Sequence, residues 1–190
     1  MAFLKSANRL IREGVVHLQR REFDKALRSF QQAERKRRDD PNILNYISQA
    51  YAGLEELDKA NEQILKAITL APDATIHRQL YATYLMRQNR HHEAIPIIDE
   101  VLETQPADLI YVLRGQADYH LGNLDSATEY FQKALELDKR NPLANHMLGL
   151  VYYRLKQYSK AIPYLETALT FGEIESLREI LADCKARTAM

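Results

Sequence analysis

Small and apolar residues recur along this chain at matching positions about 34 residues apart. The period is marked by five alanines, Ala26, Ala60, Ala94, Ala127 and Ala161, whose spacings are 34, 34, 33 and 34 residues. Each alanine has a large apolar residue four positions later and a compact residue seven positions later. Spacings of four and seven fall on one stripe of an α-helix. The pattern therefore predicts five amphipathic helices that repeat along the chain.

A second helix is predicted ahead of each of these five. Twelve positions before each alanine stands a small residue, in chain order Gly14, Ser48, Ala82, Gly115 and Gly149. A small residue is expected where two antiparallel helices cross closely, because a longer side chain would not fit there. A short turn follows, and the second helices are predicted to begin at Phe23, Leu57, His91, Leu124 and Tyr158. Each period is thus predicted to be a helical hairpin, with a proline at four of the junctions between hairpins.

This pattern resembles the tetratricopeptide repeat, and the five small residues and five alanines hold its register over nearly the whole chain. The resemblance implies an all-α fold, a right-handed α-solenoid of antiparallel helix pairs. We expect a single domain over residues 1–190. Its repeats are predicted at about 7–40, 41–74, 75–107, 108–141 and 142–172, followed by a capping helix at 173–188.

The two ends of such an array need their apolar faces covered. Near the C-terminus one helical stripe carries Ile174, Leu177, Ile180, Leu181 and Cys184, which predicts the capping helix. Docking of that helix to another protein is the alternative. At the N-terminus, Phe3, Leu4 and Leu10 begin the first helix with nothing before them. This edge is therefore a candidate for self-association.

Charge is balanced overall but unevenly placed. Residues 1–40 hold 11 lysines and arginines against 6 acidic residues, and the remainder holds 15 against 20. The densest basic run, residues 35–38, is interpreted as a cationic helix end favoured by the helix dipole. A nuclear signal or a nucleic-acid patch is the alternative. We expect no nucleic-acid partner.

The single cysteine, Cys184, excludes an intramolecular disulfide framework and suits a reducing compartment. The first residues contain no apolar run long enough for a signal peptide or a membrane span. We therefore predict a cytoplasmic protein without direct membrane insertion.

The resemblance implies that the first helix of each repeat lines a concave face that takes an extended peptide or a helix of another protein. The predicted partner-binding residues on this face are Ile11, Val15, Leu18, Asn45, Gln49, Gln79, Thr83, Met86, Val112, Gln116, Tyr119, His146, Leu150 and Tyr153. The first repeat is apolar, the middle repeats are rich in amides, and the last two carry tyrosines, which are enriched at interaction hot spots. The face suits a peptide with hydrophobic anchors.

One known specificity of the family is absent. Repeat domains that bind the acidic C-termini of Hsp70 and Hsp90 need a lysine and an asparagine in two slots that hold Ile11 and Val15 here. The basic residues expected two repeats later are replaced by Ile76 and Leu80. We therefore expect no carboxylate clamp for these chaperones.

Two polar features interrupt the pattern. Arg114 and Asp118 occupy slots that are apolar or aromatic in most repeats and stand four residues apart, so they can pair along one helix. We favour a structural pair over a ligand-binding one. His91 and His92 are adjacent near the third turn, but no third ligand has suitable spacing, so no metal site is expected.

No enzymatic motif is found, since the sequence has no glycine-rich phosphate loop and no nucleophile elbow. We predict a protein that is not an enzyme and uses no cofactor. The favoured hypothesis is a scaffold that binds another protein or peptide during assembly of a larger complex. The alternatives are a dedicated chaperone for a secretion or pilus subunit and a homo-oligomeric scaffold that assembles through the N-terminal edge.

Overall fold

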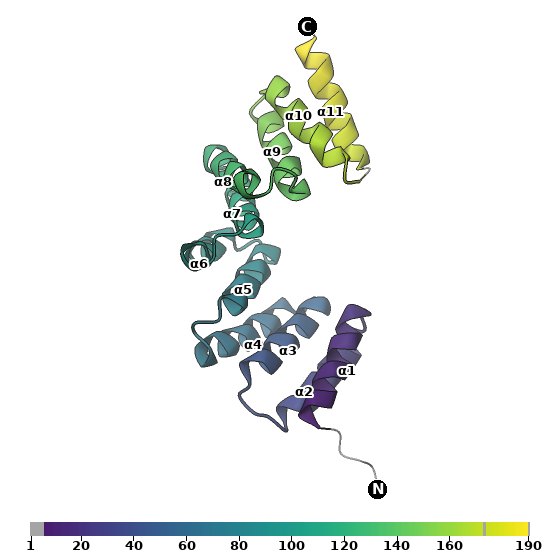
Figure 1. Cartoon of the computed structure of the whole chain (residues 1–190), viewed down its shortest axis with the longest axis vertical. Coiled ribbons are helices and arrows are strands. Elements are labelled where there is room, and N and C mark those ends of the chain that lie inside the picture. The colour runs from purple at the N-terminus through teal and green to yellow at the C-terminus, as the bar shows by residue number, and fades with distance from the viewer. Residues whose placement is uncertain (1–5, 173, 190) are drawn as a thin grey trace. The chain divides into compact units, whose positions relative to one another are not determined.

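The computed structural model describes residues 6–172 and 174–189, and every regular element within them is an α-helix (Figure 1). The prediction of an all-α chain of paired helices is confirmed. The helices are α1 (Ala7–Gln19), α2 (Phe23–Glu34), α3 (Pro41–Gly53), α4 (Leu57–Leu70), α5 (Thr75–Arg87), α6 (His91–Thr104), α7 (Asp108–Leu121), α8 (Leu124–Leu137), α9 (Pro142–Arg154), α10 (Tyr158–Leu169) and α11 (Glu175–Thr188).

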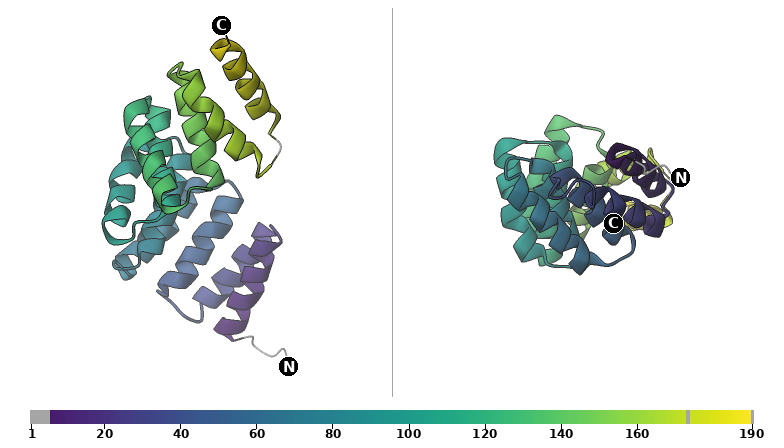
Figure 2. Two further views of the ribbon diagram at one scale, coloured as in Figure 1. Left: turned by 45° about the horizontal axis from the view of Figure 1, so that its top comes forward. Right: turned by 90° about the horizontal axis from the view of Figure 1, so that it is seen from below.

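The chain forms two compact units, Met1–Arg90 and His91–Met190, referred to below as unit 1 and unit 2. In unit 1, α1 packs on α2 and α3 on α4, while α2 contacts α3 and α4 contacts α5. In unit 2 each helix from α6 to α11 packs on the next one along the chain. Figure 2 shows α11, in yellow, alongside the end of this series. The single-domain organisation and the repeat boundaries stay predictions.

The residues that mark the period are packed between the two helices of each hairpin. All five period alanines are 0% exposed. A Cβ atom added at Gly115 would lie 2.7 Å from Cε1 of Phe131, and one at Gly149 would lie 2.6 Å from Cδ2 of Leu165. Such distances are too short for real carbon atoms. The small residue on the first helix is therefore required by a large side chain on the second, as the spacing predicts.

The turns inside the hairpins share one backbone geometry. Five residues before each period alanine the chain adopts a positive φ, at Arg21 (58°), Glu55 (62°), Asn89 (58°), Gly122 (83°) and Lys156 (58°). The amide of the next residue then donates to a carbonyl five positions earlier, at 2.9–3.0 Å in all five turns. This is the Schellman arrangement that ends a helix. Left-handed backbone favours glycine, yet only one of the five turns has it.

The C-terminal helix α11 adds to the core of unit 2. Leu177 and Cys184 are 1% and 0% exposed, and Ile180 and Leu181 pack against the same cluster. Ile174 differs from the prediction: it precedes α11 and is 42% exposed. At the other end Leu10 is buried in unit 1, while Phe3 and Leu4 lie outside the described residues.

Candidate functional site

Several residues of the predicted binding face in unit 1 pack against neighbouring helices of the same unit. Ile11, Val15 and Leu18 are half-buried on α1 and pack against the core of the first hairpin. Asn45 is only 7% exposed, and its side-chain Nδ2 lies 2.9 Å from Nδ1 of His77 on α5. The prediction that Asn45 faces a partner is therefore wrong, because the neighbouring helix covers it.

The three predicted residues of α5 lie along one face of that helix and are half-buried. The hydroxyl of Thr83 donates to the carbonyl of Gln79 at 2.8 Å, and Met86 follows one turn later. The structure keeps their side chains partly accessible and leaves their role a prediction.

A groove of about 390 Å³ opens in unit 1 between α3, α5 and the turn that joins α1 to α2. We call it the unit 1 groove. It is lined by Arg21, Phe23, Gln49, Ala52, Gly53, Glu55, Leu80, Tyr84 and Arg87. Of the fourteen predicted residues, only Gln49 belongs to it.

Gln49 presents an amide to this groove from the middle of α3. Its Nε2 donates a hydrogen bond to Oδ1 of Asn45 at 2.6 Å, and this bond fixes the side chain of Gln49. The Oε1 atom of Gln49 takes no part in that bond. The floor is apolar and ordered: Tyr84 is 3% exposed and its hydroxyl lies 3.1 Å from that of Ser48. Burial raises the pKa of the Tyr84 hydroxyl. The groove therefore combines a hydrogen-bonding group with a rigid apolar base.

The two arginines that line the groove differ in whether their guanidinium groups have partners within the chain. The guanidinium of Arg87 donates to the carbonyl of Ala52 at 3.0 Å and pairs with Glu55 at 2.7 Å. Among residues 6–172 and 174–189, no hydrogen bond or ion pair engages the guanidinium of Arg21. Arg87 is thus part of the wall, and Arg21 is available to a ligand.

The predicted binding residues of α7 and α9 in unit 2 are also buried or half-buried. Val112 is 2% exposed, so its assignment to a binding surface is also wrong. Gln116 and Leu150 are half-buried, and Leu150 packs against the core of the unit.

Each of the two predicted tyrosines contacts the second helix after its own, α9 for Tyr119 and α11 for Tyr153. Arg154 covers the ring of Tyr119 at 4.8 Å from its centre and donates to the carbonyl of Tyr119 at 3.3 Å. The hydroxyl of Tyr153 donates to the carboxylate of Asp183 on α11 at 3.0 Å, and this bond raises the pKa of Tyr153. These side chains link helices within unit 2, and a role in binding stays a prediction.

A second hollow in unit 2 contains His146. It has a volume of about 320 Å³ and is lined by Pro142, Leu143, His146, Ala168, Phe171, Gly172 and Ile174. His146 carries the only polar side chain among these, and burial lowers the pKa of its imidazole. Arg140 lies 5.2 Å from the centre of the Phe171 ring at this hollow. The hollow suits an apolar group.

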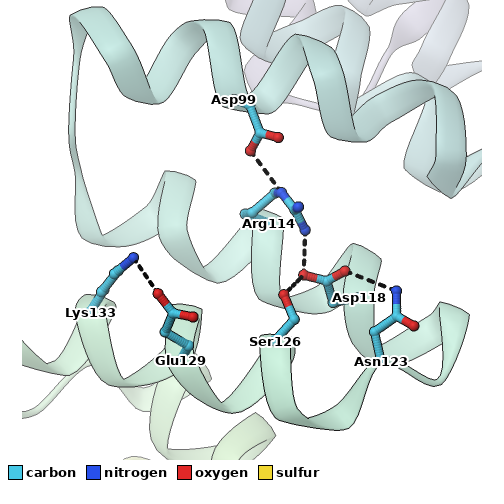
Figure 3. A network of polar contacts seen from close by, with 7 residues as sticks. All are labelled: Asp99, Arg114, Asp118, Asn123, Ser126, Glu129 and Lys133. Carbon is cyan, nitrogen blue, oxygen red and sulfur yellow. Dashed lines mark hydrogen bonds and ion pairs between the residues drawn. The ribbon is translucent and has the colours of Figure 1, made fainter.

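Arg114 and Asp118 form the polar network that Figure 3 shows. Arg114 pairs with Asp118 and, through Nε at 2.7 Å, with Asp99 on α6. Ser126 donates to the carboxylate of Asp118 at 2.6 Å, and Asn123 does so at 3.3 Å. Burial alone would lower the pKa of Arg114, but its bonds and charge contacts with the two aspartates raise it. The partners are all supplied by unit 2, which supports the structural interpretation of this pair.

Eight residues that line the groove were not among the predicted ones, and half of them are small or lie in turns. Ala52 and Gly53 carry no functional group, and Arg21 lies in a turn outside the predicted face. A recurring signal was present for Arg87: Arg154 occupies the same slot, and each donates to the carbonyl 35 residues earlier. The exposed apolar residues of the unit 2 hollow repeat as well, since Leu109 and Leu143 share one slot and Leu137 and Phe171 another.

The chain belongs to the tetratricopeptide repeat family, whose sequence profiles match residues 11–75 and 107–173. It is 27% identical over 150 residues to tetratricopeptide repeat protein 16 of Homo sapiens, covering 68% of this chain and 17% of the human protein.

Solved structures show the same fold. MamA from Desulfovibrio magneticus RS-1, from residue 41 to its end, superposes with a TM-score of 0.78 at 22% identity, covering 86% of this chain and 93% of that one. PilF of Pseudomonas aeruginosa superposes with a TM-score of 0.81 at 18% identity, covering 95% and 89%. These likenesses place the chain among all-α tetratricopeptide solenoids.

The described residues contain neither a candidate membrane span nor a candidate metal site. No helix among them combines the length and apolar character needed to cross a bilayer. No three histidine, cysteine or acidic side chains gather there as metal ligands would.

Proposed function

We propose that this chain is a non-catalytic scaffold whose unit 1 groove binds an extended segment of another protein, in the assembly of a larger complex. The observation that carries this proposal is the groove itself. Within about 390 Å³ it presents a fixed amide, an available cation and an apolar floor. Membership of a family of repeat proteins supports a binding role, since a stacked-repeat surface suits such interactions.

The polar lining favours an extended segment over a helix. An extended backbone exposes donors and acceptors that lose water on binding and need partners. Gln49 offers an amide, and Arg21 offers a guanidinium, while Phe23 and Leu80 leave apolar surface for a side chain between them. A helix satisfies its own backbone and would leave these polar groups unused.

The other hypotheses remain as proposals of lower rank. A chaperone for a secretion or pilus subunit would also use a groove, and it would be distinguished by one client that becomes insoluble when this chain is deleted. Self-association through the N-terminal edge would make the molar mass depend on protein concentration. A cytoplasmic location is likewise proposed.

The test begins with a displayed library of random twelve-residue peptides selected on the chain. Peptides that bind are synthesised and titrated by fluorescence anisotropy against the wild type and Gln49→Ala. The matched control is Gln116→Ala, because Gln116 occupies the same slot on α7 in unit 2. We expect Gln49→Ala to weaken binding about fivefold or more, the scale of one lost hydrogen bond, while the control binds as the wild type.

The proposal fails if no peptide is selected, or if both variants bind like the wild type. Thermal melting of Gln49→Ala accompanies the titration, because the substitution also removes the bond to Asn45. A variant that melts as the control does, yet binds weakly, assigns the loss to the groove.

A further inference from the structure

The charged side chains that line the unit 1 groove do not balance. Glu55 is the only acid among the lining residues, and Arg87 holds it at 2.7 Å. The second cation, Arg21, makes no ion pair with any described residue. The groove therefore presents one uncompensated positive charge to whatever enters it.

The acid nearest to Arg21 in sequence is occupied elsewhere. Glu22 accepts from Lys25 at 2.9 Å, and its other oxygen lies 2.6 Å from Nδ1 of His17. The hydrogen bonds to Lys25 and His17 lower the pKa of Glu22. Arg20, on the other side of Arg21, also has no side-chain partner in the described part of the chain. The turn between α1 and α2 is thus positive at the mouth of the groove.

The backbone beneath Arg21 is fixed. Its φ is 58°, its amide donates to the carbonyl of Leu18 at 2.9 Å, and the amide of Glu22 donates to that of His17 at 2.9 Å. The guanidinium is therefore carried by a rigid turn and loses little backbone freedom when it pairs. Arginine also matches a carboxylate with two parallel hydrogen bonds.

We propose that the unit 1 groove selects extended segments in which an aspartate or glutamate side chain pairs with Arg21 beside an apolar side chain that packs on Phe23 and Leu80. This inference rests on the proposed function and names its partner class, an acidic segment with an adjacent apolar anchor. Because successive side chains of an extended chain alternate sides, the two residues are expected two positions apart. Arg21 then acts as the residue that sets specificity.

The first test is the composition of the selected peptides. Selection on the wild type should enrich an acidic residue two positions from a large apolar one. Selection on Arg21→Glu should lose this enrichment. Glutamate is suited to the position because Glu55 holds the same backbone conformation in the next hairpin, with a φ of 62°.

The second test uses one selected peptide in three forms, with glutamate, glutamine or lysine at the acidic position. All three carry an amidated C-terminus, so that only a side chain can supply the carboxylate. The wild type should prefer the glutamate form about tenfold, and less so at high salt. Arg21→Glu should prefer the lysine form. The matched control is Arg28→Glu, an exposed cation of α2 outside the groove, which should keep the wild-type preference.

The acidic specificity and the proposed function can be contradicted separately. Equal affinities of the three peptides for the wild type, or an unchanged preference in Arg21→Glu, would overturn the acidic specificity. If Gln49→Ala still weakened all three peptides, the groove would remain the binding site. If Gln49→Ala had no effect either, the proposed function itself would be wrong. Binding that requires a free C-terminal carboxylate would contradict the side-chain assignment.

Discussion

The hairpins α3–α4 in unit 1 and α7–α8 in unit 2 share a backbone but end their first helices differently. In two matching slots, α3 carries Ala52 and Gly53, whereas α7 carries Tyr119 and His120. Gly53 leaves room for the ring of Phe23, because a Cβ atom at Gly53 would lie 2.6 Å from Cγ of that ring. The small pair and Phe23 together line the unit 1 groove.

In unit 2 the same slots are occupied by rings. Arg154 covers Tyr119 at 4.8 Å from the ring centre, and His120 stacks on His91 with ring centres 4.7 Å apart. His91 fills the slot that Phe23 fills in unit 1. One repeat template therefore packs Phe23 directly against Gly53 in unit 1 and stacks His91 on His120 in unit 2. The groove lies beside the smaller pair.

The interiors of the two hairpins also differ. α3 places Ile47 and Tyr51 where α7 places Arg114 and Asp118. Asp118 is 2% exposed, so its charge depends on its partners. Removing one partner of a buried pair costs more than replacing the whole pair by well-packed apolar groups.

The largest expected effect is therefore that of Arg114→Ala, which leaves Asp118 buried beside Ser126 and Asn123 without its cation. We expect a loss of about 3–5 kcal/mol in the free energy of unfolding, measured by urea denaturation. The double substitution Arg114→Ile with Asp118→Tyr, which copies α3, should recover most of this loss. A double variant as unstable as the single one would contradict the view that the slots are interchangeable.

A smaller effect is expected where the helices cross. α3 pairs Ser48 with Ile64, whereas α7 pairs Gly115 with Phe131, all of them buried. Gly115→Ser should destabilise by about 1–3 kcal/mol through overpacking, because its Cβ would meet the Phe131 ring. Adding Phe131→Ile should restore part of the stability. Calorimetric melting of the two variants checks this. Equal melting temperatures would show that the volume of the side chain opposite position 115 does not determine the cost of the added Cβ atom.

The turns offer a weaker contrast. Gly122 and Lys156 hold the same left-handed position in successive hairpins of unit 2. Gly122→Lys should cost about 1 kcal/mol, the price of that conformation for a residue with a Cβ. Lys156→Gly should gain less, because glycine also increases the freedom of the unfolded chain. Chemical denaturation of both variants measures the difference, and a stable Gly122→Lys variant would contradict the strain assigned to these turns.

The smallest effect concerns pH and the stacked rings. Burial, and then the neighbouring His120 and His92, lower the pKa of His91. The unfolded chain therefore binds the proton more readily, so stability is full above about pH 6.5 and is lost as the pH falls from there toward the folded pKa. Phe23 suggests the control: His91→Phe should melt with a weaker pH dependence between pH 7.5 and 5.5. Identical pH profiles would exclude His91 as the cause.

Most of the fold could be predicted from the sequence because the residues that pack between helices recur with a fixed period. Alanines at the helix crossings and glycines opposite large side chains must recur wherever the hairpin recurs, so spacing alone locates them. The unit 1 groove, by contrast, depends on which side chain stands at a few individual positions. Asn45 and Val112 were misplaced because whether a slot faces outward depends on the next helix, and His77 covers Asn45. Ala52 occupies a slot of the predicted face but is not among the predicted binding residues, because its methyl group offers a ligand no functional group.

The central claim, that the hollow above Ala52 is the binding site, is tested most directly by filling it. Ala52→Tyr copies Tyr119 and offers Arg87 a ring such as the one that Arg154 covers in unit 2. Because Ala52 is 4% exposed, we expect this variant to lose about 1–3 kcal/mol of stability through overpacking and to remain folded. The folded variant should bind the selected acidic peptide at least tenfold more weakly by fluorescence anisotropy. The matched variant Tyr119→Ala, in unit 2, should bind it as the wild type does. Wild-type affinity in a folded Ala52→Tyr variant would contradict the account.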